Sequence, residues 1–383
     1  MTGKRINRRN LLASSLAMAT SPLLIHCAPE SGNNSASRPI QHTELNPWGV
    51  NTFLHQDAEL WRKQKTLEMT AQAGIGWIKQ HFPWSDIEQS AKGNFTDPFW
   101  RTDAWDKYDQ IVDLADDYNL KLIARIDRPP KWAQTEVSTP TSPPANLEDF
   151  ADFIFKLVSR YRGRVRHFQI WNEPNLSHEW GGQRPDPESY VKLLRAAYKA
   201  AKQADPETLI LSAPLAATNE NTFRAMNELD FLNRMYASGA ARFFDIHSAN
   251  AFGLQHPPEA SPSPDVLNFR RVELSRAIME QNGDGAKPIW FNEYGWNASP
   301  SSLPKHVLTW SRVTETVQAE WTVRGIEYAR KNWPWAGVIC IWFFRRQYND
   351  VGPESPEYYF RMVDPDFTPR PIYKAVQEAA TRT

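Results

Sequence analysis

Short apolar segments alternate with amphipathic segments eight times along this chain of 383 residues, and this order restricts the possible folds more than any other feature of the sequence. The apolar segments carry few charges, which is typical of parallel strands covered on both faces. They lie at 48–54, 77–82, 121–126, 165–171, 209–213, 243–249, 289–292 and 337–343. Eight repeats of strand then helix predict an α/β fold, a single (β/α)8 TIM barrel.

The predicted helix after the fourth strand has the clearest boundaries. Asp186 is a suitable N-cap, Pro187 fits the first turn, and apolar residues recur at helical spacing from Tyr190 to Ala201. Asn146, followed by Asp149, predicts the start of the preceding helix in the same way. Helices in these places would return the chain to the next parallel strand, as a barrel requires.

The first 27 residues have the composition of an export signal. An apolar stretch at 11–25 is shorter than the roughly 20 residues that a membrane-spanning helix needs. Residues 7–12 (Asn-Arg-Arg-Asn-Leu-Leu) resemble a twin-arginine signal, a bacterial export route for folded proteins. Basic side chains precede the apolar stretch, namely Lys4, Arg5, Arg8 and Arg9. We therefore expect a periplasmic, cell-surface or extracellular protein.

Cys27 allows two interpretations of how this signal is processed. It ends a segment, 24–27, that is similar to a bacterial lipoprotein attachment box except that His26 replaces the expected small residue. The alternatives are a lipid anchor at Cys27, which would be the only membrane contact, and an ordinary cleavable signal. Residues 28–44 begin with a run rich in Ser, Asn and Pro and predict a flexible linker, so the folded domain is expected to span 45–383.

Composition limits the class of partner. Lys plus Arg and Asp plus Glu both total 44, so no broad positive field favours nucleic acid, and a neutral small molecule or polymer is the expected partner. Sixteen tryptophans supply flat apolar faces with polar edges, which suit sugar rings. The body contains a single cysteine, Cys340, in an apolar run, which predicts a buried thiol and no internal disulfide.

Two short motifs each place a glutamate where an apolar run ends. Glu173 lies in 171–174 (Trp-Asn-Glu-Pro), and Glu293 lies in 291–296 (Phe-Asn-Glu-Tyr-Gly-Trp). Each could be a solvated glutamate at a strand end. However, a barrel brings the ends of its strands together around one mouth, and cleavage of a glycosidic bond needs two facing carboxyl groups. We therefore interpret the two glutamates as a catalytic pair.

These motifs resemble the acid/base and nucleophile motifs of glycoside hydrolase clan A, with families 5 and 39 the most similar. The resemblance extends over the body and includes 82–84 (Phe-Pro-Trp) and 368–371 (Thr-Pro-Arg-Pro). It implies that Glu173 is the general acid/base, Glu293 the nucleophile, and Asn172 a hydrogen-bond partner of the sugar's 2-hydroxyl. It further implies that Trp342 is the aromatic floor beneath the reacting sugar.

The chemistry of such a pair is consistent with a retaining mechanism. An ionised Glu293 would raise the pKa of Glu173, and the repulsion would vanish once Glu293 became an ester. Glu173 could then ionise and activate water. We therefore expect carboxyl groups about 5 to 5.5 Å apart, whereas a separation beyond about 6.5 Å would indicate inversion.

The sequence departs from the clan pattern on two strands. Asn250 and Phe252 replace the His and Tyr that clan members often carry on the sixth strand, so the usual donor to the nucleophile is absent. Tyr294 or Asn51 could supply that hydrogen bond instead. The arginine that is common on the second strand is replaced by Lys79 or Gln80.

Aromatic and basic residues follow several strands. The tryptophans expected to line the mouth and contact sugar are Trp84, Trp132, Trp180 and Trp296, and packing beneath a loop is the alternative for each. Arg345 and Arg346 could receive an acidic sugar or pair with nearby carboxylates, and we favour pairing. His247 is predicted to be a core histidine. No metal-ligand pattern is present, and no cofactor is expected.

The sequence as a whole predicts an exported retaining glycoside hydrolase that acts on a β-linked glycan or glycoside. Two rivals remain. The first is a catalytically weak carbohydrate-binding protein on the same scaffold, suggested by Asn250 and Phe252. The second is a barrel enzyme that uses the carboxylates on a substrate other than a sugar.

Overall fold

The computed structural model describes residues 39–135, 139–347 and 350–382. The expected export signal, with Cys27, and residues 28–38 of the expected linker lie outside this part of the chain. Within 39–44, the backbone oxygen of His42 accepts a hydrogen bond of 3.0 Å from Trp290 Nε1. The described helices include none that combines the length and the apolar character needed to span a membrane.

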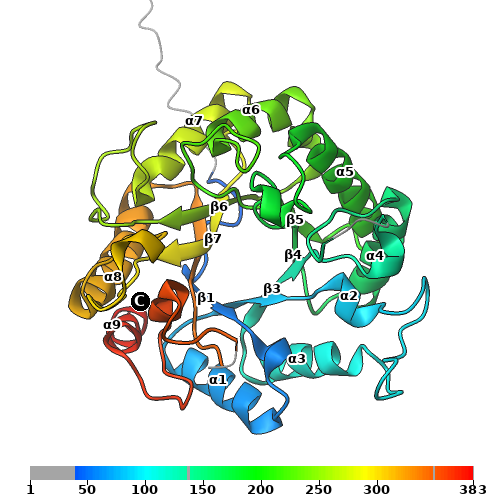
Figure 1. Cartoon of the computed structure of the whole chain (residues 1–383), viewed down its shortest axis with the longest axis horizontal. Coiled ribbons are helices and arrows are strands. Elements are labelled where there is room, and N and C mark those ends of the chain that lie inside the picture. The colour runs from blue at the N-terminus through cyan, green and yellow to red at the C-terminus, as the bar shows by residue number, and fades with distance from the viewer. Residues whose placement is uncertain (1–38, 136–138, 348–349, 383) are drawn as a thin grey trace, which may run out of the picture. The chain divides into compact units, whose positions relative to one another are not determined.

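Eight parallel strands form the centre of the molecule, in the order β5-β4-β3-β2-β1-β8-β7-β6 (Figure 1). A parallel bridge from Leu211 to Ile246 joins the outer strands and closes the barrel. The strands are β1 (Trp48–Thr52), β2 (Trp77–His81), β3 (Lys121–Ile126), β4 (His167–Ile170), β5 (Leu209–Leu211), β6 (His247–Phe252), β7 (Ile289–Gly295) and β8 (Ala336–Ile341). The predicted single (β/α)8 TIM barrel is confirmed.

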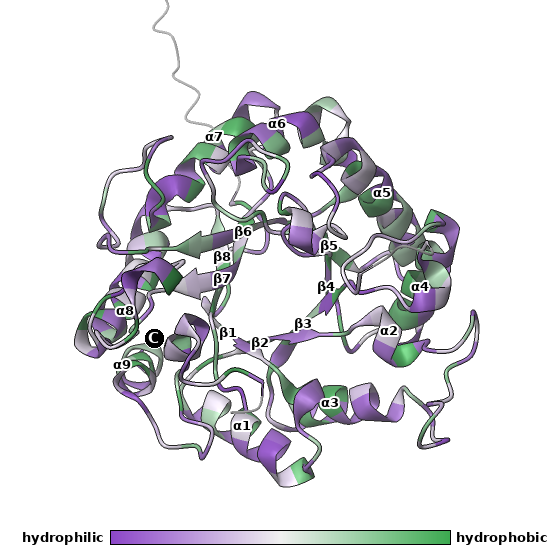
Figure 2. Ribbon diagram, viewed as in Figure 1, coloured by the Kyte–Doolittle hydropathy of each residue, from purple (hydrophilic) through white to green (hydrophobic). Residues whose placement is uncertain are grey.

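Helices form a ring outside the strands (Figure 1). They are α1 (Leu60–Gln72), α2 (Trp84–Ile87), α3 (Asp106–Asp117), α4 (Leu147–Arg160), α5 (Pro187–Ala204), α6 (Glu228–Ala237), α7 (Val272–Gln281), α8 (Glu315–Asn332) and α9 (Pro371–Ala380). Both hydrophobic and hydrophilic residues occur on these helices (Figure 2). In α4, for example, the buried side chains from Phe150 to Val158 recur at helical spacing and pack into the main core.

The two helix starts predicted from capping residues are confirmed. Asp186 accepts a hydrogen bond of 3.0 Å from the backbone nitrogen of Ser189 at the start of α5. Asn146 accepts one of 2.9 Å from the backbone nitrogen of Glu148 at the start of α4. Each cap satisfies a backbone donor that the first helical turn leaves unpaired.

The sixth strand begins later than the predicted 243–249. Residues Ala240–Phe243 form a short 3-10 helix, and the side chain of Asp245 accepts a hydrogen bond of 2.8 Å from the backbone nitrogen of Ile210. The register between β6 and β7 shifts between Ala249 and Asn250. β6 ends at Phe252, beyond the predicted end at 249, so Asn250 and Phe252 lie on the strand.

An apolar cluster from five of the strands and from the residue directly before β6 fills the lower part of the barrel. Its buried residues are Trp77, Ile123, Leu211, Ile246, Trp290, Val338 and Cys340. Side chains two positions further along a strand point to the same face. The barrel interior above this cluster is therefore reached by Lys79 and Arg125, so the interior changes from apolar to charged toward the carboxyl ends of the strands. Cys340 is buried and unbridged, as predicted.

Candidate active site

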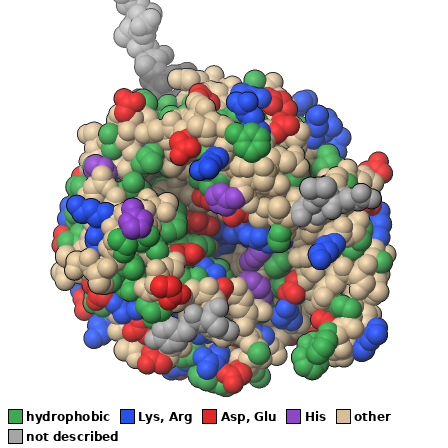
Figure 3. Space-filling model, in the orientation of Figure 1, with side chains coloured by type: hydrophobic (Ala, Val, Ile, Leu, Met, Phe, Trp, Pro, Cys, Tyr) green, Lys and Arg blue, Asp and Glu red, His purple; other side chains and the backbone are tan. Residues whose placement is uncertain are grey.

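A hollow lies at the centre of the face seen in Figure 3, and acidic, basic and histidine side chains are visible within it. The carboxyl ends of parallel barrel strands surround such a mouth. Glu173 and Glu293 both lie at this end, at the close of β4 and within β7. The barrel therefore brings together two motifs that are remote in the sequence.

The backbone around Glu173 adopts an unusual conformation. Glu173 has φ 40°, a left-handed value that costs a non-glycine residue about 1–3 kcal/mol and persists only where neighbours hold it in place. Its backbone nitrogen donates to the carbonyl oxygen of Pro214 at 3.0 Å. Nearby, the buried side chain of Asn175 donates to the carbonyl oxygens of Ala216 (2.8 Å) and Met226 (2.9 Å). These bonds anchor the loop that positions Glu173.

Glu293 is buried and pairs with a lysine from β2. Lys79 Nζ lies 3.1 Å from Glu293 Oε1 and 3.3 Å from the carbonyl oxygen of Asn292. The two suggested substitute donors were wrong. Tyr294 donates to the carbonyl oxygen of Thr322 at 2.8 Å, outside the barrel, because its side chain points away from the mouth. Asn51 donates to the Asn292 carbonyl oxygen (2.9 Å) instead of to the carboxylate.

Asn250 connects the two glutamates. Its Nδ2 atom donates to Glu173 Oε1 at 2.7 Å and to Glu293 Oε2 at 3.2 Å. Because one nitrogen contacts both, these two oxygens lie within about 6 Å of each other, closer than the roughly 6.5–9.5 Å of inverting glycosidases. Asn250 replaces the usual histidine but still reaches the nucleophile position.

The pKa of Glu173 is raised, as the sequence predicted for the general acid of the pair. Burial, followed by the charge of Glu293, raises the pKa of Glu173 to about 8. Burial also lowers the pKa of Lys79, and the adjacent Glu293 opposes this change. At neutral pH the carboxyl group of Glu173 is therefore protonated, and it lies beside the contact of Lys79 with Glu293.

A second polar group lines the mouth between β2 and β4. Arg125 Nε donates to Asp127 Oδ2 at 2.7 Å, and His81 Nε2 contacts the other oxygen of Asp127. Burial would raise the pKa of Asp127, but Arg125 and His81 outweigh it and hold that pKa well below its usual range. Glu179 lies 4.0 Å from Arg128 Nη2, and burial raises the pKa of Glu179.

Arg345 and Arg346 pair with carboxylates, as predicted. Arg345 Nη2 lies 2.5 Å from Asp57 Oδ2, and both side chains are buried. Arg346 pairs with Asp350 and with Glu357. Neither arginine is therefore an unpaired cation that is available to bind an acidic sugar.

The tryptophans predicted to line the mouth are mostly core residues. Trp84, Trp180 and Trp296 are almost fully buried in the main core, so the prediction was wrong for them. Their rings turn outward between strands and helices, as in the stacking of Trp84 on Phe153 at 5.3 Å. Trp132 is half-buried, with Nε1 donating to the carbonyl oxygen of Glu88.

Two other predicted contact residues remain at the site. Trp342, directly after β8, is partly exposed and meets the ring of Phe53 edge to face at 5.7 Å. Asn172, beside Glu173, is 4% exposed, and its Oδ1 atom has no hydrogen-bond partner among the described residues. Phe53 could not be identified from the sequence as a neighbour of Trp342, because no motif marks the residue after β1.

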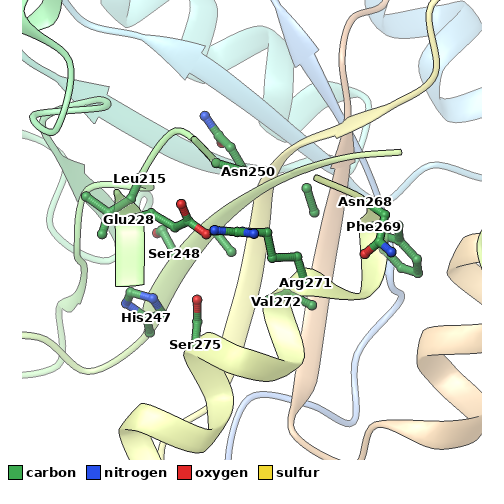
Figure 4. A pocket seen from close by; sticks show the side chains of 13 residues that line it. Leu215, Glu228, His247, Ser248, Asn250, Asn268, Phe269, Arg271, Val272 and Ser275 are labelled. Carbon is green, nitrogen blue, oxygen red and sulfur yellow. The ribbon is translucent and has the colours of Figure 1, made fainter. Parts of the chain in front are cut away.

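A small cavity of about 20 Å³ lies against β6 (Figure 4). The guanidinium of Arg271 points at the carboxylate of Glu228 there, and both side chains are buried. His247, at the start of β6, contacts Ser212 Oγ at 3.0 Å, which is consistent with the predicted core histidine. The described residues contain no cluster of three or more His, Cys, Asp or Glu side chains that could hold a metal ion.

A closed (β/α)8 barrel with two glutamates facing each other at its mouth defines a class, the clan A glycoside hydrolases. The model of the family described as cellulase (glycosyl hydrolase family 5) matches residues 35–248, more than half of the chain. The chain therefore belongs to glycosyl hydrolase family 5. The match includes Glu173 and ends before Glu293, so the place of the second glutamate rests on the barrel geometry.

Two curated relatives carry the name beta-xylosidase. The one from Caldicellulosiruptor saccharolyticus is 24% identical over 349 residues, which cover 86% of this chain and 65% of the relative. The one from Geobacillus stearothermophilus is 25% identical over 178 residues, which cover 42% of this chain and 33% of the relative. The chain thus spans less than two thirds of the length of either relative.

Solved structures support the same fold. A family 39 glycoside hydrolase from Bacteroides cellulosilyticus WH2 has a TM-score of 0.66 at 20% identity, covering 88% of this chain and 63% of that one. A monomeric beta-xylosidase from Caulobacter crescentus CB15 has a TM-score of 0.60 at 20% identity, covering 86% and 67%. At such identities the likeness concerns the barrel alone.

Proposed function

We propose that this protein is a retaining glycoside hydrolase that cleaves β-glycosidic bonds by double displacement, without a cofactor. The observation that carries the proposal is the contact of Asn250 Nδ2 with both Glu173 and Glu293, at 2.7 and 3.2 Å. That spacing suits attack by one carboxylate on an anomeric carbon while the other protonates the leaving oxygen. An inverting enzyme, which needs room for a water between its carboxyl groups, separates them by roughly 6.5–9.5 Å.

In the first step Glu293 attacks the anomeric carbon and forms an ester as the glycosidic C–O bond breaks. Glu173 transfers its proton to the departing oxygen. The raised pKa of Glu173, about 8, keeps that proton available at neutral pH. Lys79, 3.1 Å from Glu293, holds the attacking carboxylate in place.

In the second step water cleaves the ester. Once Glu293 is esterified it no longer repels a charge on Glu173, so Glu173 can ionise and take a proton from the water. The water oxygen bonds to the anomeric carbon, and the ester C–O bond breaks to release Glu293. Two inversions at one carbon restore the original configuration.

Neighbouring amides are suited to orient the sugar. The Oδ1 atoms of Asn172 and Asn250 are buried without partners among the described residues. An unpaired buried acceptor is costly, and a sugar hydroxyl could satisfy each. Trp342 is partly exposed beside them and could lie beneath the ring.

The test is a panel of aryl β-glycosides and β-linked polysaccharides, beginning with an aryl β-xyloside because both curated relatives are named beta-xylosidase. We expect hydrolysis of at least one neutral β-glycoside, with NMR showing the β-anomer as the first product. Release of the α-anomer first would overturn the retaining mechanism.

An alternative function is that of a catalytically weak carbohydrate-binding protein. It is suggested by the replacement of the usual His and Tyr by Asn250 and Phe252. It predicts that glycans raise the Tm while no member of the panel is hydrolysed. A barrel enzyme acting on a substrate other than a sugar predicts neither hydrolysis nor stabilisation by any glycan.

We also propose that residues 1–27 direct export, which rests on the basic and apolar segments of the sequence. Fractionation of a bacterium expressing the full chain should place the protein outside the cytoplasm. Replacement of Arg8 and Arg9 by lysine should block twin-arginine export. Labelling with a fatty acid, compared with the Cys27→Ser variant, separates a lipid-anchored protein from a freely released one.

A further inference from the structure

We propose that Arg125 and Glu179 recognise hydroxyl groups of the bound sugar and that the site accepts a neutral glycone and rejects a uronic acid. This inference rests on the proposed hydrolase function and deepens it. Arg125 lies on β3 and Glu179 follows β4, so both belong to the wall of the mouth next to the catalytic pair.

Charge pairing at the mouth argues for a neutral sugar. Five cations that lie on or directly after β2, β3 and β8 face a carboxylate, as the pairs Lys79–Glu293, Arg125–Asp127, Arg128–Glu179, Arg345–Asp57 and Arg346–Glu357 show. A sugar carboxylate beside these five cations would find each of them already paired, and it would lose its own hydration. Burial of an unpaired charge costs far more than burial of a hydroxyl group.

Arg125 retains hydrogen-bonding capacity that the protein does not use. Its Nε atom donates to Asp127, but its two terminal nitrogens have no hydrogen-bond partner among the described residues. Its side chain is 12% exposed, so the guanidinium is not sealed in the core. A guanidinium held at Nε presents its remaining donors in a fixed plane, which suits neighbouring hydroxyl oxygens.

Glu179 supplies acceptors on the same wall. Its carboxylate accepts no hydrogen bond from the described residues, since the 4.0 Å to Arg128 Nη2 exceeds hydrogen-bond length. The side chain is 18% exposed. Arg125 and Glu179 lie close enough for each to act on the other's charge, and Glu179 also acts on Glu173. A donor and an acceptor thus stand beside the general acid, an arrangement for adjacent hydroxyls of one ring.

The experiment compares Arg125→Gln and Glu179→Gln with the wild-type chain, using Glu207→Gln as the matched control. Glu207 is exposed and precedes β5, at the opposite end of the barrel from the mouth. The substrates are the best neutral aryl β-glycoside, its monodeoxy analogues and the aryl β-glucuronide. We expect each site variant to lose at least about tenfold in kcat/KM on the parent glycoside, as for a hydrogen bond to a charged group.

The deoxy substrates separate recognition from a structural role. If Arg125 binds one hydroxyl, removal of that hydroxyl lowers kcat/KM for the wild type but causes little further loss in Arg125→Gln, so the two effects are not additive. A variant that merely distorts the barrel would lose activity on every analogue by the same factor and would lower the Tm. Additive losses for both residues would overturn the recognition role.

The remaining outcomes are equally decisive. A β-glucuronide hydrolysed faster than every neutral glycoside would contradict the neutral glycone. Site variants that behave as Glu207→Gln does on the parent glycoside would refute this inference and leave the hydrolase proposal standing. If the wild type hydrolyses no glycoside at all, the proposed function itself fails.

Discussion

Asn250 and Lys79 together supply the hydrogen-bond donors to Glu293 in this site. A clan member with the usual pattern carries His and Tyr on the sixth strand, whereas here one amide nitrogen contacts both Glu173 and Glu293. The second donor to Glu293 comes from Lys79 on β2, not from β6. Glu293 therefore still accepts hydrogen bonds from two side chains, although these side chains differ from those of the usual clan pattern.

Substitution of the two glutamates should separate their roles. Glu293→Ala should abolish turnover, because no carboxylate remains to attack. Glu173→Ala should lose roughly 10²- to 10⁴-fold on substrates with poor leaving groups, the usual range for acid/base assistance. It should lose much less on activated aryl glycosides, where protonation matters little. Steady-state kinetics on both substrate types measures the difference.

Added azide provides the check on Glu173→Ala. Azide needs no general base, so it should restore the rate and give a β-glycosyl azide. Equal losses on both substrate types, with no effect of azide, would contradict the acid/base role.

The pH dependence should follow Glu173. With a pKa of about 8, the protonated form that catalysis needs is present below this pH and is lost above it, so kcat/KM should fall as the pH rises through about 8. The hydrogen bond from Asn250 lowers that pKa, so Asn250→Ala should move the alkaline limb to higher pH. A pH profile on a substrate with a poor leaving group tests both statements. An unmoved limb would show that Asn250 does not act on Glu173.

At the scale of elements, the sequence predicted what local chemistry determines. Asp186 and Asn146 cap helices where expected, and apolar runs marked the strands. The error at β6 arose because Phe243 and Phe244 are apolar but lie before the strand, where they pack beside helices instead of extending the sheet. An apolar run predicts that its side chains are buried. Burial alone does not distinguish a strand from the turn that precedes it.

The ion pair between α6 and the segment before α7 should contribute to stability. Arg271 and Glu228 are buried, and Glu228 also accepts a hydrogen bond of 2.9 Å from the backbone nitrogen of Thr218. Arg271→Met would leave a buried carboxylate without its cation, which costs about 3–5 kcal/mol. Urea unfolding measures the change. Arg234→Met, in the exposed pair with Glu188, should cost no more than about 1 kcal/mol.

The double variant Arg271→Met, Glu228→Met tests the reason for that loss. It removes both charges, so it should be more stable than Arg271→Met alone. If it is equally unstable, lost packing and not the unpaired charge explains the effect.

At the scale of the whole molecule, the barrel was predictable and much of the detail of the site was not. The repeat of strands and helices sufficed to place Glu173 and Glu293 at one mouth. The contact of Lys79 with Glu293 joins β2 to β7 across the closed barrel, and no local pattern specifies it. Likewise, Trp84 and Trp296 follow strands as mouth residues do, but the sequence does not say that their rings turn toward the helices.

The raised pKa of Glu173 also makes the stability of the fold depend on pH. An unfolded glutamate has a pKa near 4.5, so between about 4.5 and 8 the folded chain holds a proton that the unfolded chain releases. This contribution is fully present below about pH 4.5 and is lost as the pH rises through 8. Glu173→Gln cannot ionise. Its Tm relative to the wild type should therefore rise from pH 5 to pH 9, as measured by calorimetry, whereas the exposed Glu207→Gln should show no such trend. A constant difference across that range would mean that the fold does not raise the pKa of Glu173.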